Sequence, residues 1–191
     1  MIKASKEDKN LIIDLLNKVF DKNHSVNFVV KQDSKRYKRI KALMTYSFEV
    51  CYQYGDIYLS TDKKACALIL YPDKRKNTIL LDIKLLLNCI GFSEAKKVLD
   101  RNSKINTHYP TKTMNYLWFI GVEATHQGKG LGSSLLNEII TEADAQNRPI
   151  YLETSMLENL PFYERLGFTI YGELNFGHNL YLLKRNITPL E

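Results

Sequence analysis

The segment QGKGLG, residues 127–132, has glycine at every second position. A backbone without side chains lets an anion approach its N–H groups closely, and a helix that begins there favours negative charge at its N-terminal end. Lys129 adds a positive charge, and Ser133 and Ser134 follow with hydroxyl donors. A pyrophosphate is a ligand that such a segment is suited to bind.

The glycine spacing excludes two common phosphate-binding motifs. The Walker A pattern GxxxxGK[ST] is absent, and the dinucleotide fingerprint G-x-G-x-x-G differs from the G-x-G-x-G found here. A glycine-rich turn between a strand and a helix also occurs where the helix simply packs closely on a sheet. Taken alone, the segment therefore leaves both phosphate binding and close packing open.

One carboxylate, Glu153, interrupts the apolar segment IYLETS. On a strand, Tyr151, Glu153 and Ser155 share one face. Burial raises the pKa of a carboxyl group, so Glu153 is suited to act as a base near neutral pH. It can equally orient a cationic amine, or form a structural pair with an arginine or a backbone N–H. Glu123 and His126, in the segment VEATHQ, are expected to be exposed to solvent.

The elements that must position these groups are predicted most clearly in the second half of the chain. Residues 116–122, YLWFIGV, form a continuous apolar run, which is typical of a strand covered on both faces. Apolar residues then recur with helical spacing from Leu131 to Ala143, Pro149 follows, and residues 150–155 predict a second strand. A strand, a helix of about 18 residues and a strand form a crossover unit, so we expect the two strands to be parallel.

The rest of the chain also alternates between helical and strand patterns, so we expect an α/β fold around a mixed sheet. Helices are predicted over residues 5–19, 33–53, 78–90, 93–104 and 159–166, strands over 56–60, 65–71, 168–174 and 179–184, and a polar loop over 102–113. The two pairs of neighbouring strands are expected to form hairpins. Ser5 and Asp8 have the spacing of a capping box at the start of the first helix.

The length and composition are those of a globular protein with one domain over residues 1–191. No stretch approaches ~18 apolar residues, and the first ten residues lack the apolar part of a signal peptide, so neither a membrane segment nor secretion is expected. Cys51, Cys66 and Cys89 form no close pair in the sequence, and the four histidines are isolated. We therefore expect no disulfide framework, no metal site and a cytoplasmic location.

Two segments together resemble the signatures of the GNAT acetyltransferase superfamily. IGVEATHQGKGLGSSLL resembles its coenzyme-A-binding motif, [QR]-x-x-G-x-[GA] after a strand, with Gln127, Gly130 and Gly132 at the matching positions. YLETSMLENLPFYERLGF resembles its second signature, which is a strand, an asparagine, a helix with a tyrosine, and then GF. The resemblance covers residues 116–174 and is close to the puromycin N-acetyltransferase-like branch, whereas residues 1–110 match only in the order of elements.

The resemblance implies a GNAT-like mixed, strongly twisted central sheet with a splayed parallel strand pair and helices on both faces. The pantetheine arm of coenzyme A would enter between the splayed strands and bond to the main chain of Phe119, Ile120 and Val122. Asn159 matches the asparagine that contacts this arm. The residues that would hold the pyrophosphate are Gln127, Gly128, Lys129, Gly130, Leu131, Gly132 and Ser133.

Tyr163 matches the family's tyrosine near the thioester sulfur, and the resemblance implies that it acts as the general acid. A phenol of pKa ~10 is a suitable donor to a departing thiolate of pKa ~8.5. The alternative is that Tyr163 only packs its ring, since Phe162 and Leu166 beside it are typical core residues. Relatives often begin the first central strand with a histidine where this chain has Asn115, which argues against a histidine-based mechanism unless His108 replaces it.

The function implied by the resemblance is an acetyl-CoA-dependent N-acetyltransferase that moves an acetyl group directly to a primary amine. Acetyl-CoA would be the co-substrate, the acceptor would be a small molecule or a peptide, and no metal is implied. Homodimers are common in the family. Tyr116 and Trp118 are candidates to line the acceptor pocket. A non-catalytic acyl-CoA-binding module on the same fold is the alternative.

The positive charge is concentrated in residues 1–110, which carry 21 Lys and Arg against 12 Asp and Glu, a balance of +9. Residues 111–191 carry 6 against 9, a balance of −3. The densest run, KQDSKRYKRIK at residues 31–41, is suited to attract nucleic acid or a phosphorylated ligand, but a solvated helix face is the simpler interpretation. No nucleic-acid-binding motif accompanies it, so we expect no nucleic-acid partner. The basic half could favour an acidic acceptor or meet the 3′-phosphate of coenzyme A.

Overall fold

The computed structural model describes residues 1–188 of the chain. Its main helices are α1 (Lys9–Val19), α2 (His24–Val29), α3 (Arg36–Tyr54), α4 (Ile79–Leu85), α5 (Ala95–Asn106), α6 (Leu131–Ala145) and α7 (Leu160–Glu164). Its strands are β1 (Ile2–Lys3), β2 (Gly55–Leu59), β3 (Ala65–Leu70), β4 (Asn115–Val122), β5 (Ile150–Thr154), β6 (Thr169–Asn175) and β7 (Asn179–Arg185). Within residues 1–188, no helix combines the length and the apolar character needed to span a bilayer.

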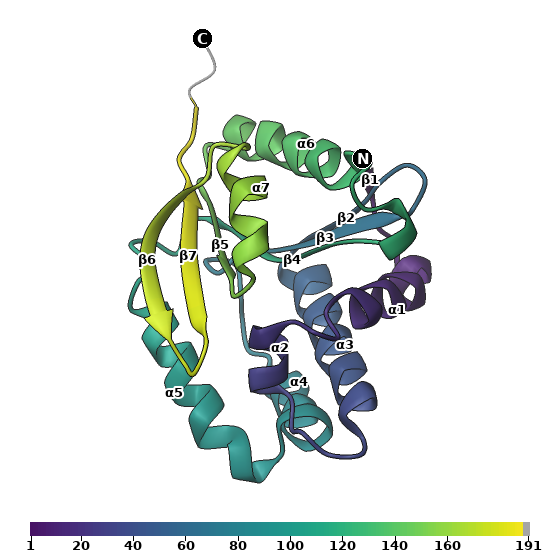
Figure 1. Cartoon of the computed structure of the whole chain (residues 1–191), viewed down its shortest axis with the longest axis vertical. Helices are drawn as coiled ribbons and strands as arrows, with labels where there is room; N and C mark the ends of the chain where they lie inside the picture. Colours follow the sequence, from purple (N-terminus) through teal and green to yellow (C-terminus); the bar gives the residue numbers. More distant parts are fainter. Residues whose placement is uncertain (189–191) are drawn as a thin grey trace.

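The strands form one seven-stranded mixed sheet in the order β1-β2-β3-β4-β5-β7-β6. β4 and β5 are parallel, and every other neighbouring pair is antiparallel. The helix α6 connects the parallel pair and lies with α7 on one side of the sheet, whereas α1 and α3 lie on the other (Figure 1). The expected α/β fold with a mixed sheet, a parallel central pair and two hairpins is therefore confirmed.

The position of α6 follows from its sequence. Gly130 precedes the helix in the left-handed conformation, with a φ of 82°. The apolar stripe that buries against the sheet is Leu135, Leu136, Ile139, Ile140 and Ala143. Burying each of the larger side chains contributes about 1.5–3 kcal/mol. The stripe fixes the helix on the sheet, and its first turn consequently lies close to the end of β4.

β4 contains a bulge at Trp118. Leu68 of β3 pairs with Phe119, and the next residue of β3, Ile69, pairs with Leu117. Trp118 is therefore an extra residue that interrupts the usual alternation of faces. Trp118 and Phe119 both pack on the α1–α3 side of the sheet, with their ring centroids 6.0 Å apart, whereas Leu117 faces α6.

β4 and β5 separate soon after they meet. They form two pairs, Asn115 with Ile150 and Tyr116 with Tyr151, and no further pair follows in the described strands. Up to Val122, β4 remains paired with β3 along its other edge. The edge of β4 that faces β5 is thus left without a strand partner, which is the splayed arrangement that the resemblance implies.

The secondary structure differs from the prediction at α5, at α2 and at the two-residue strand β1, which the sequence pattern does not show. α5 continues to Asn106, so the polar loop expected from residue 102 begins only after it. The helix continues because Val98, Arg101 and Ile105 form one buried stripe, and a charged residue in that stripe hides the pattern in the sequence. The second difference is α2, a six-residue helix that is too short to show periodicity.

Candidate functional site

The glycine loop, residues 127–132, joins the end of β4 to the first turn of α6. Gly128 and Gly130 have φ angles of 74° and 82°, and a Cβ built on either would meet no atom within 4 Å. Within the described chain, the N–H groups of Gly128, Lys129 and Gly130 donate to no backbone carbonyl. The first turn of α6 carries no acidic residue. The loop therefore offers an anion free amides, open space and the positive end of a helix dipole.

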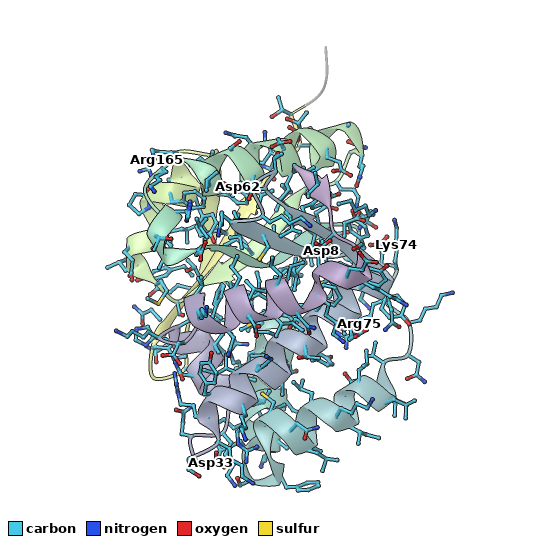
Figure 2. All side chains as sticks on the ribbon, turned by 90° about the vertical axis from the view of Figure 1, so that its right-hand side faces the viewer. Asp8, Asp33, Asp62, Lys74, Arg75 and Arg165 are labelled. Atoms are coloured by element: carbon cyan, nitrogen blue, oxygen red, sulfur yellow. The ribbon has the colours of Figure 1, made fainter. Side chains whose placement is uncertain are left out.

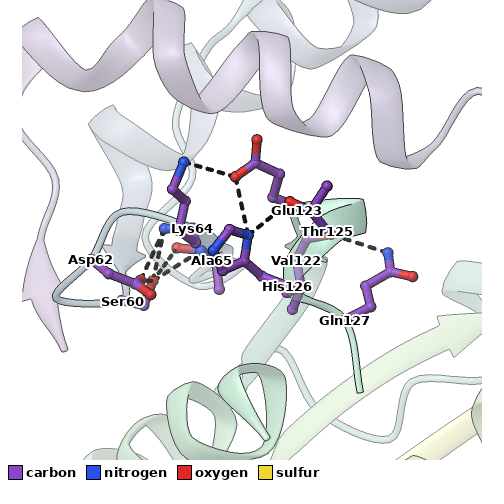
Figure 3. Close-up of polar contacts among 9 residues, drawn as sticks. All are labelled: Ser60, Asp62, Lys64, Ala65, Val122, Glu123, Thr125, His126 and Gln127. Carbon is purple, nitrogen blue, oxygen red and sulfur yellow. Dashed lines mark hydrogen bonds and ion pairs between the residues drawn. The ribbon is translucent and has the colours of Figure 1, made fainter. Parts of the chain in front are cut away.

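Polar contacts hold the loop against the neighbouring strands (Figure 3). Gln127 Nε2 donates to the carbonyl of Val122 at 3.1 Å, which ties the loop to the last residue of β4. Glu123 pairs with Lys64 Nζ at 2.8 Å, and this contact holds the pKa of the Glu123 carboxyl below its usual range. The side chains of Glu123 and His126 are 41% and 32% exposed and lie 3.4 Å apart. Both side chains are thus partly exposed, in broad agreement with the sequence, and each has a charged neighbour.

A cavity of about 590 Å³ lies on the α1–α3 side of the diverging strands. Its wall is mainly apolar and comes from α2 to α5 together with β4 and β5. We call it the central cavity; the lining residues that matter most below are Tyr46, Arg75, Arg101, Tyr116, Trp118 and Glu153. Trp118 and Phe119 both line this cavity, because the bulge places these two consecutive residues of β4 on the same side of the sheet.

Glu153 projects from β5 into the central cavity, on the same face as Ser155. Its Oε2 accepts a hydrogen bond from the Tyr116 hydroxyl at 2.7 Å, and its Oε1 accepts one from the Tyr109 hydroxyl. Burial raises the pKa of the Glu153 carboxyl to about 7, while Arg101 acts in the opposite direction. A carboxyl group with this pKa can both accept and return a proton near neutral pH.

Tyr163 lies in α7 between the rings of Phe162 and Phe168, whose centroids are 5.0 and 5.7 Å from its own. The side chain is 7% exposed, and burial raises the pKa of its hydroxyl. The phenol is thus protonated at neutral pH, as a proton donor must be, although the same contacts also fit a packing role. Phe162 lies 3.7 Å from a Cβ built on Gly132, so α7 packs against the glycine loop. Asn159 precedes α7 and makes no capping hydrogen bond with its side chain.

The two candidate proton-transfer groups lie on opposite sides of the sheet. Tyr163 belongs to the apolar cluster on the α6 side, whereas Glu153 faces the central cavity. β4 and β5 diverge beyond their two residue pairs and leave a gap in the hydrogen-bonded sheet between these two sides. The unpaired edge of β4, which includes Phe119, Ile120 and Val122, runs along this gap toward the glycine loop.

Asn115 has a structural role. Its Oδ1 accepts a hydrogen bond from Arg148 Nε at 2.8 Å, and Arg148 also pairs with Asp73. His108 is exposed, its Nδ1 lies 2.8 Å from the carbonyl of Lys104, and it is not part of the wall of the central cavity. Its position therefore gives no support to a replacement of the missing histidine. Between residues 1 and 188, no group of three or more His, Cys, Asp or Glu side chains is arranged to share a metal ion.

The basic run at residues 31–41 forms the start of α3 and the loop before it. Arg36 pairs with Asp21, and Arg39 pairs with Asp33, each at 2.7 Å. Asp33 lies at the lower end of the molecule in Figure 2. Because these pairs cancel part of the positive charge within the chain, they favour the interpretation of a solvated helix face.

The second half of the chain is similar to known acetyltransferases. Residues 88–170 match the family model described as acetyltransferase (GNAT) domain. Over 77 residues, the chain is 39% identical to an uncharacterized N-acetyltransferase of Schizosaccharomyces pombe, a match that covers 40% of this chain and 29% of the relative. Over 107 residues, it is 33% identical to the histone acetyltransferase MCC1 of Arabidopsis thaliana, which covers 51% of this chain and 42% of the relative. The matches thus span less than half the length of these curated relatives.

A solved structure shares the fold over the whole chain. It is that of the histone acetyltransferase HPA2 and related acetyltransferase from Corynebacterium glutamicum, with a TM-score of 0.70 and 22% identity. The superposition covers 100% of this chain and 97% of that chain, so the likeness of fold includes the first 87 residues, which the family model does not match.

Proposed function

We propose that the chain is an N-acetyltransferase that transfers the acetyl group of acetyl-CoA directly to a primary amine. The proposal is supported by the match of residues 88–170 to the model of the GNAT acetyltransferase domain. The observation that carries the proposal is the unpaired edge of β4, which leads from the central cavity to the glycine loop. A long ligand can lie along this edge with its diphosphate on the loop and its acyl end near Glu153.

In the proposed complex, the pantetheine arm bonds to the main chain of Phe119, Ile120 and Val122, and Asn159 contacts the same arm. The free amides of the glycine loop support the proposed diphosphate site. The residues assigned to this site are Gln127, Gly128, Lys129, Gly130, Leu131, Gly132 and Ser133.

The transfer requires the amine to lose a proton and the thiolate to gain one. The amine nitrogen attacks the thioester carbon, the C–N bond forms, and the C–S bond breaks. In the proposed mechanism the Glu153 carboxylate takes a proton from the amine, while Tyr163 gives its phenolic proton to the departing thiolate. Glu153 then releases its proton to solvent and Tyr163 takes one from solvent, which restores both groups. Alignment of the reactants can supply about 7–11 kcal/mol, and a β4 N–H directed at the oxyanion about 3 kcal/mol.

Acetyl-CoA is expected to raise the Tm of the protein by roughly 5 to 10 °C at a concentration of about 100 times its Kd, because such a ligand adds about 2.7 kcal/mol to the stability. Release of free thiol from a panel of primary amines then measures transfer. Cys51, Cys66 and Cys89 are buried, and burial raises the pKa of the Cys66 thiol to about 12, so a thiol reagent reports the coenzyme.

The two measurements separate the candidate functions. Absence of a Tm shift would contradict coenzyme binding altogether. A Tm shift without thiol release from any amine would favour the non-catalytic acyl-CoA-binding module instead.

Tyr163→Phe is expected to lower kcat by about tenfold and to leave the KM for acetyl-CoA unchanged. The effect is modest because a thiolate of pKa ~8.5 leaves without full assistance. Tyr181→Phe is the control, because Tyr181 packs against the same apolar cluster as Tyr163. Steady-state kinetics of both variants give the comparison, and an unchanged kcat in Tyr163→Phe would leave Tyr163 with a packing role.

Several narrower expectations stay predictions. The seven-stranded sheet, with strands from β1 to β7, supports one domain over residues 1–191. Membership of the puromycin N-acetyltransferase-like branch, a homodimer and a cytoplasmic location rest on the sequence alone. The names of the curated relatives do not agree on one acceptor. We therefore infer the acceptor from the residues that line the central cavity.

A further inference from the structure

Arg101 occupies a position where a charged residue is rarely found. It lies in the buried stripe of α5, between Val98 and Ile105, and is 9% exposed. It also lines the central cavity. Arginine remains charged in proteins, and a buried arginine is normally paired with an acidic group.

Arg101 has no such partner within residues 1–188. Its one side-chain hydrogen bond runs from Nη1 to Asn102 Oδ1 at 3.4 Å, and its buried Nε has no hydrogen-bond partner. Arg75 lines the same cavity and provides a contrast. Arg75, labelled in Figure 2, donates to Tyr46 and Thr78 and forms an ion pair with Asp82.

Glu153, a carboxylate in the wall of the same cavity, does not fully compensate the charge of Arg101. The charge of Arg101 lowers the pKa of Glu153, but the two carboxyl oxygens of Glu153 already accept hydrogen bonds from Tyr109 and Tyr116. Because the pKa of Glu153 is about 7, a large share of the molecules carry a neutral Glu153 at neutral pH. The guanidinium charge is thus left in need of an anion.

The two aromatic neighbours of the guanidinium lie outside the cavity wall. The rings of Phe28 and Phe176 lie 6.0 and 5.7 Å from its central carbon, and their centroids are 5.7 Å apart. Both rings therefore lie on the same side of Arg101, and neither is part of the cavity wall. Arg101 itself does line the cavity, and so does Ser25, whose Oγ is also buried without a partner.

We propose that Arg101 binds an acidic group of the acceptor, so that the acceptor is a primary amine with a carboxylate and an apolar body. The planar fork of an arginine matches a carboxylate with two parallel hydrogen bonds. Ser25 Oγ can supply a further donor to the same group. The mainly apolar wall, with Leu43 and Trp118, accommodates the rest of the molecule. The requirement for an amine in the acceptor rests on the proposed function, whereas the anion site at Arg101 does not depend on it.

The test uses 3-phenylpropanoate, which carries the acid and an apolar body but no amine, and 3-phenylpropan-1-ol as its uncharged counterpart. Without coenzyme, the acid at about ten times its Kd is expected to raise the Tm of the wild-type protein by roughly 3 °C, and the alcohol by clearly less. Arg101→Met should lose the response to the acid, and Arg101→Lys should keep part of it.

The unliganded variants distinguish an anion site from a structural role. Arg101→Met removes an uncompensated buried charge, so its own Tm should stay equal to that of the wild type or rise. Arg75→Met is the matched control in the same cavity: it breaks contacts to Tyr46, Thr78 and Asp82, so its Tm should fall while the response to the acid persists. A lower Tm in Arg101→Met, or a response to the acid that survives this substitution, would overturn the proposal.

The result is independent of the proposed function. If acetyl-CoA gives no Tm shift but the acid does, the anion site stands and the coenzyme site fails. If transfer occurs, a matched pair of amines extends the test. The wild-type kcat/KM should favour phenylalanine over 2-phenylethylamine, which lacks only the carboxylate, by about tenfold or more, and Arg101→Met should remove this preference. A wild-type preference for the uncharged amine would contradict the inference.

Discussion

Gly130→Glu should abolish the rise in Tm caused by acetyl-CoA and should lower kcat/KM by about a thousandfold or more. A Cβ on Gly130 meets no atom within 4 Å, so the new side chain enters open space. Its carboxylate then lies where the coenzyme diphosphate is proposed to bind. Two like charges 4 Å apart repel by about 4 kcal/mol at an effective dielectric constant of 20, which corresponds to roughly a thousandfold in affinity. Thermal melting and thiol release measure the two effects.

Gly177→Glu is the matched control for this variant. Gly177 has a φ of 83°, close to the 82° of Gly130, and it too has no atom within 4 Å of a built Cβ. Both substitutions place a side chain in the left-handed region at a cost of about 1–2 kcal/mol, so the unliganded proteins should lose stability to a similar extent. Only Gly130→Glu should lose the response to acetyl-CoA. A normal response in that variant would remove the glycine loop as the coenzyme site.

Glu153→Gln should lower kcat/KM by about a hundredfold or more and should remove its dependence on pH around neutrality. Burial raises the pKa of the Glu153 carboxyl to about 7. Below this pH the group is protonated and cannot accept a proton, so the wild-type kcat/KM should rise with pH through about 7. Glutamine keeps the shape of the side chain but cannot take the proton. Profiles of kcat/KM between about pH 5 and pH 9 test this expectation. Ionisation of the acceptor amine, whose pKa is about 10, causes a separate rise of kcat/KM at higher pH.

Glu123→Gln is the control for the loss of a carboxylate near the strand ends. Glu123 pairs with Lys64 at the surface, and the pKa of its carboxyl is already below its usual range, so this variant should keep the wild-type rate and pH profile. A limb near pH 7 that persists in Glu153→Gln would show that another group accepts the proton.

The central part of the fold is predictable from the sequence because two strong patterns coincide there. The apolar run of β4 and the apolar stripe of α6 each belong to one element, and the glycines mark the junction between them. The alternation in IYLETS likewise predicts that Glu153 and Ser155 share a face, and both line the central cavity. Local patterns of this kind predict the structure well, because the spacing of the side chains along a strand or helix decides which of them are buried on the sheet.

The residues that complete the cavity are harder to predict, because long-range contacts place them. Tyr109 comes from a polar loop without periodicity, yet its hydroxyl donates to Glu153. Arg101 belongs to a helix whose charged residues suggest exposure, and the rings that lie beside its guanidinium, Phe28 and Phe176, come from distant parts of the sequence. The bulge at Trp118 is equally invisible in the run YLWFIGV, since nothing in an all-apolar strand marks an extra residue.

That bulge gives the protein a built-in optical reporter. Trp118 is the single tryptophan of the 191 residues, it lines the central cavity, and the ring of Tyr46 meets it edge-on at 5.9 Å. Indole fluorescence from this molecule therefore comes from one known place. An acceptor that enters the cavity alters the polarity around that indole and shifts its emission, so occupancy can be titrated without labels and without turnover.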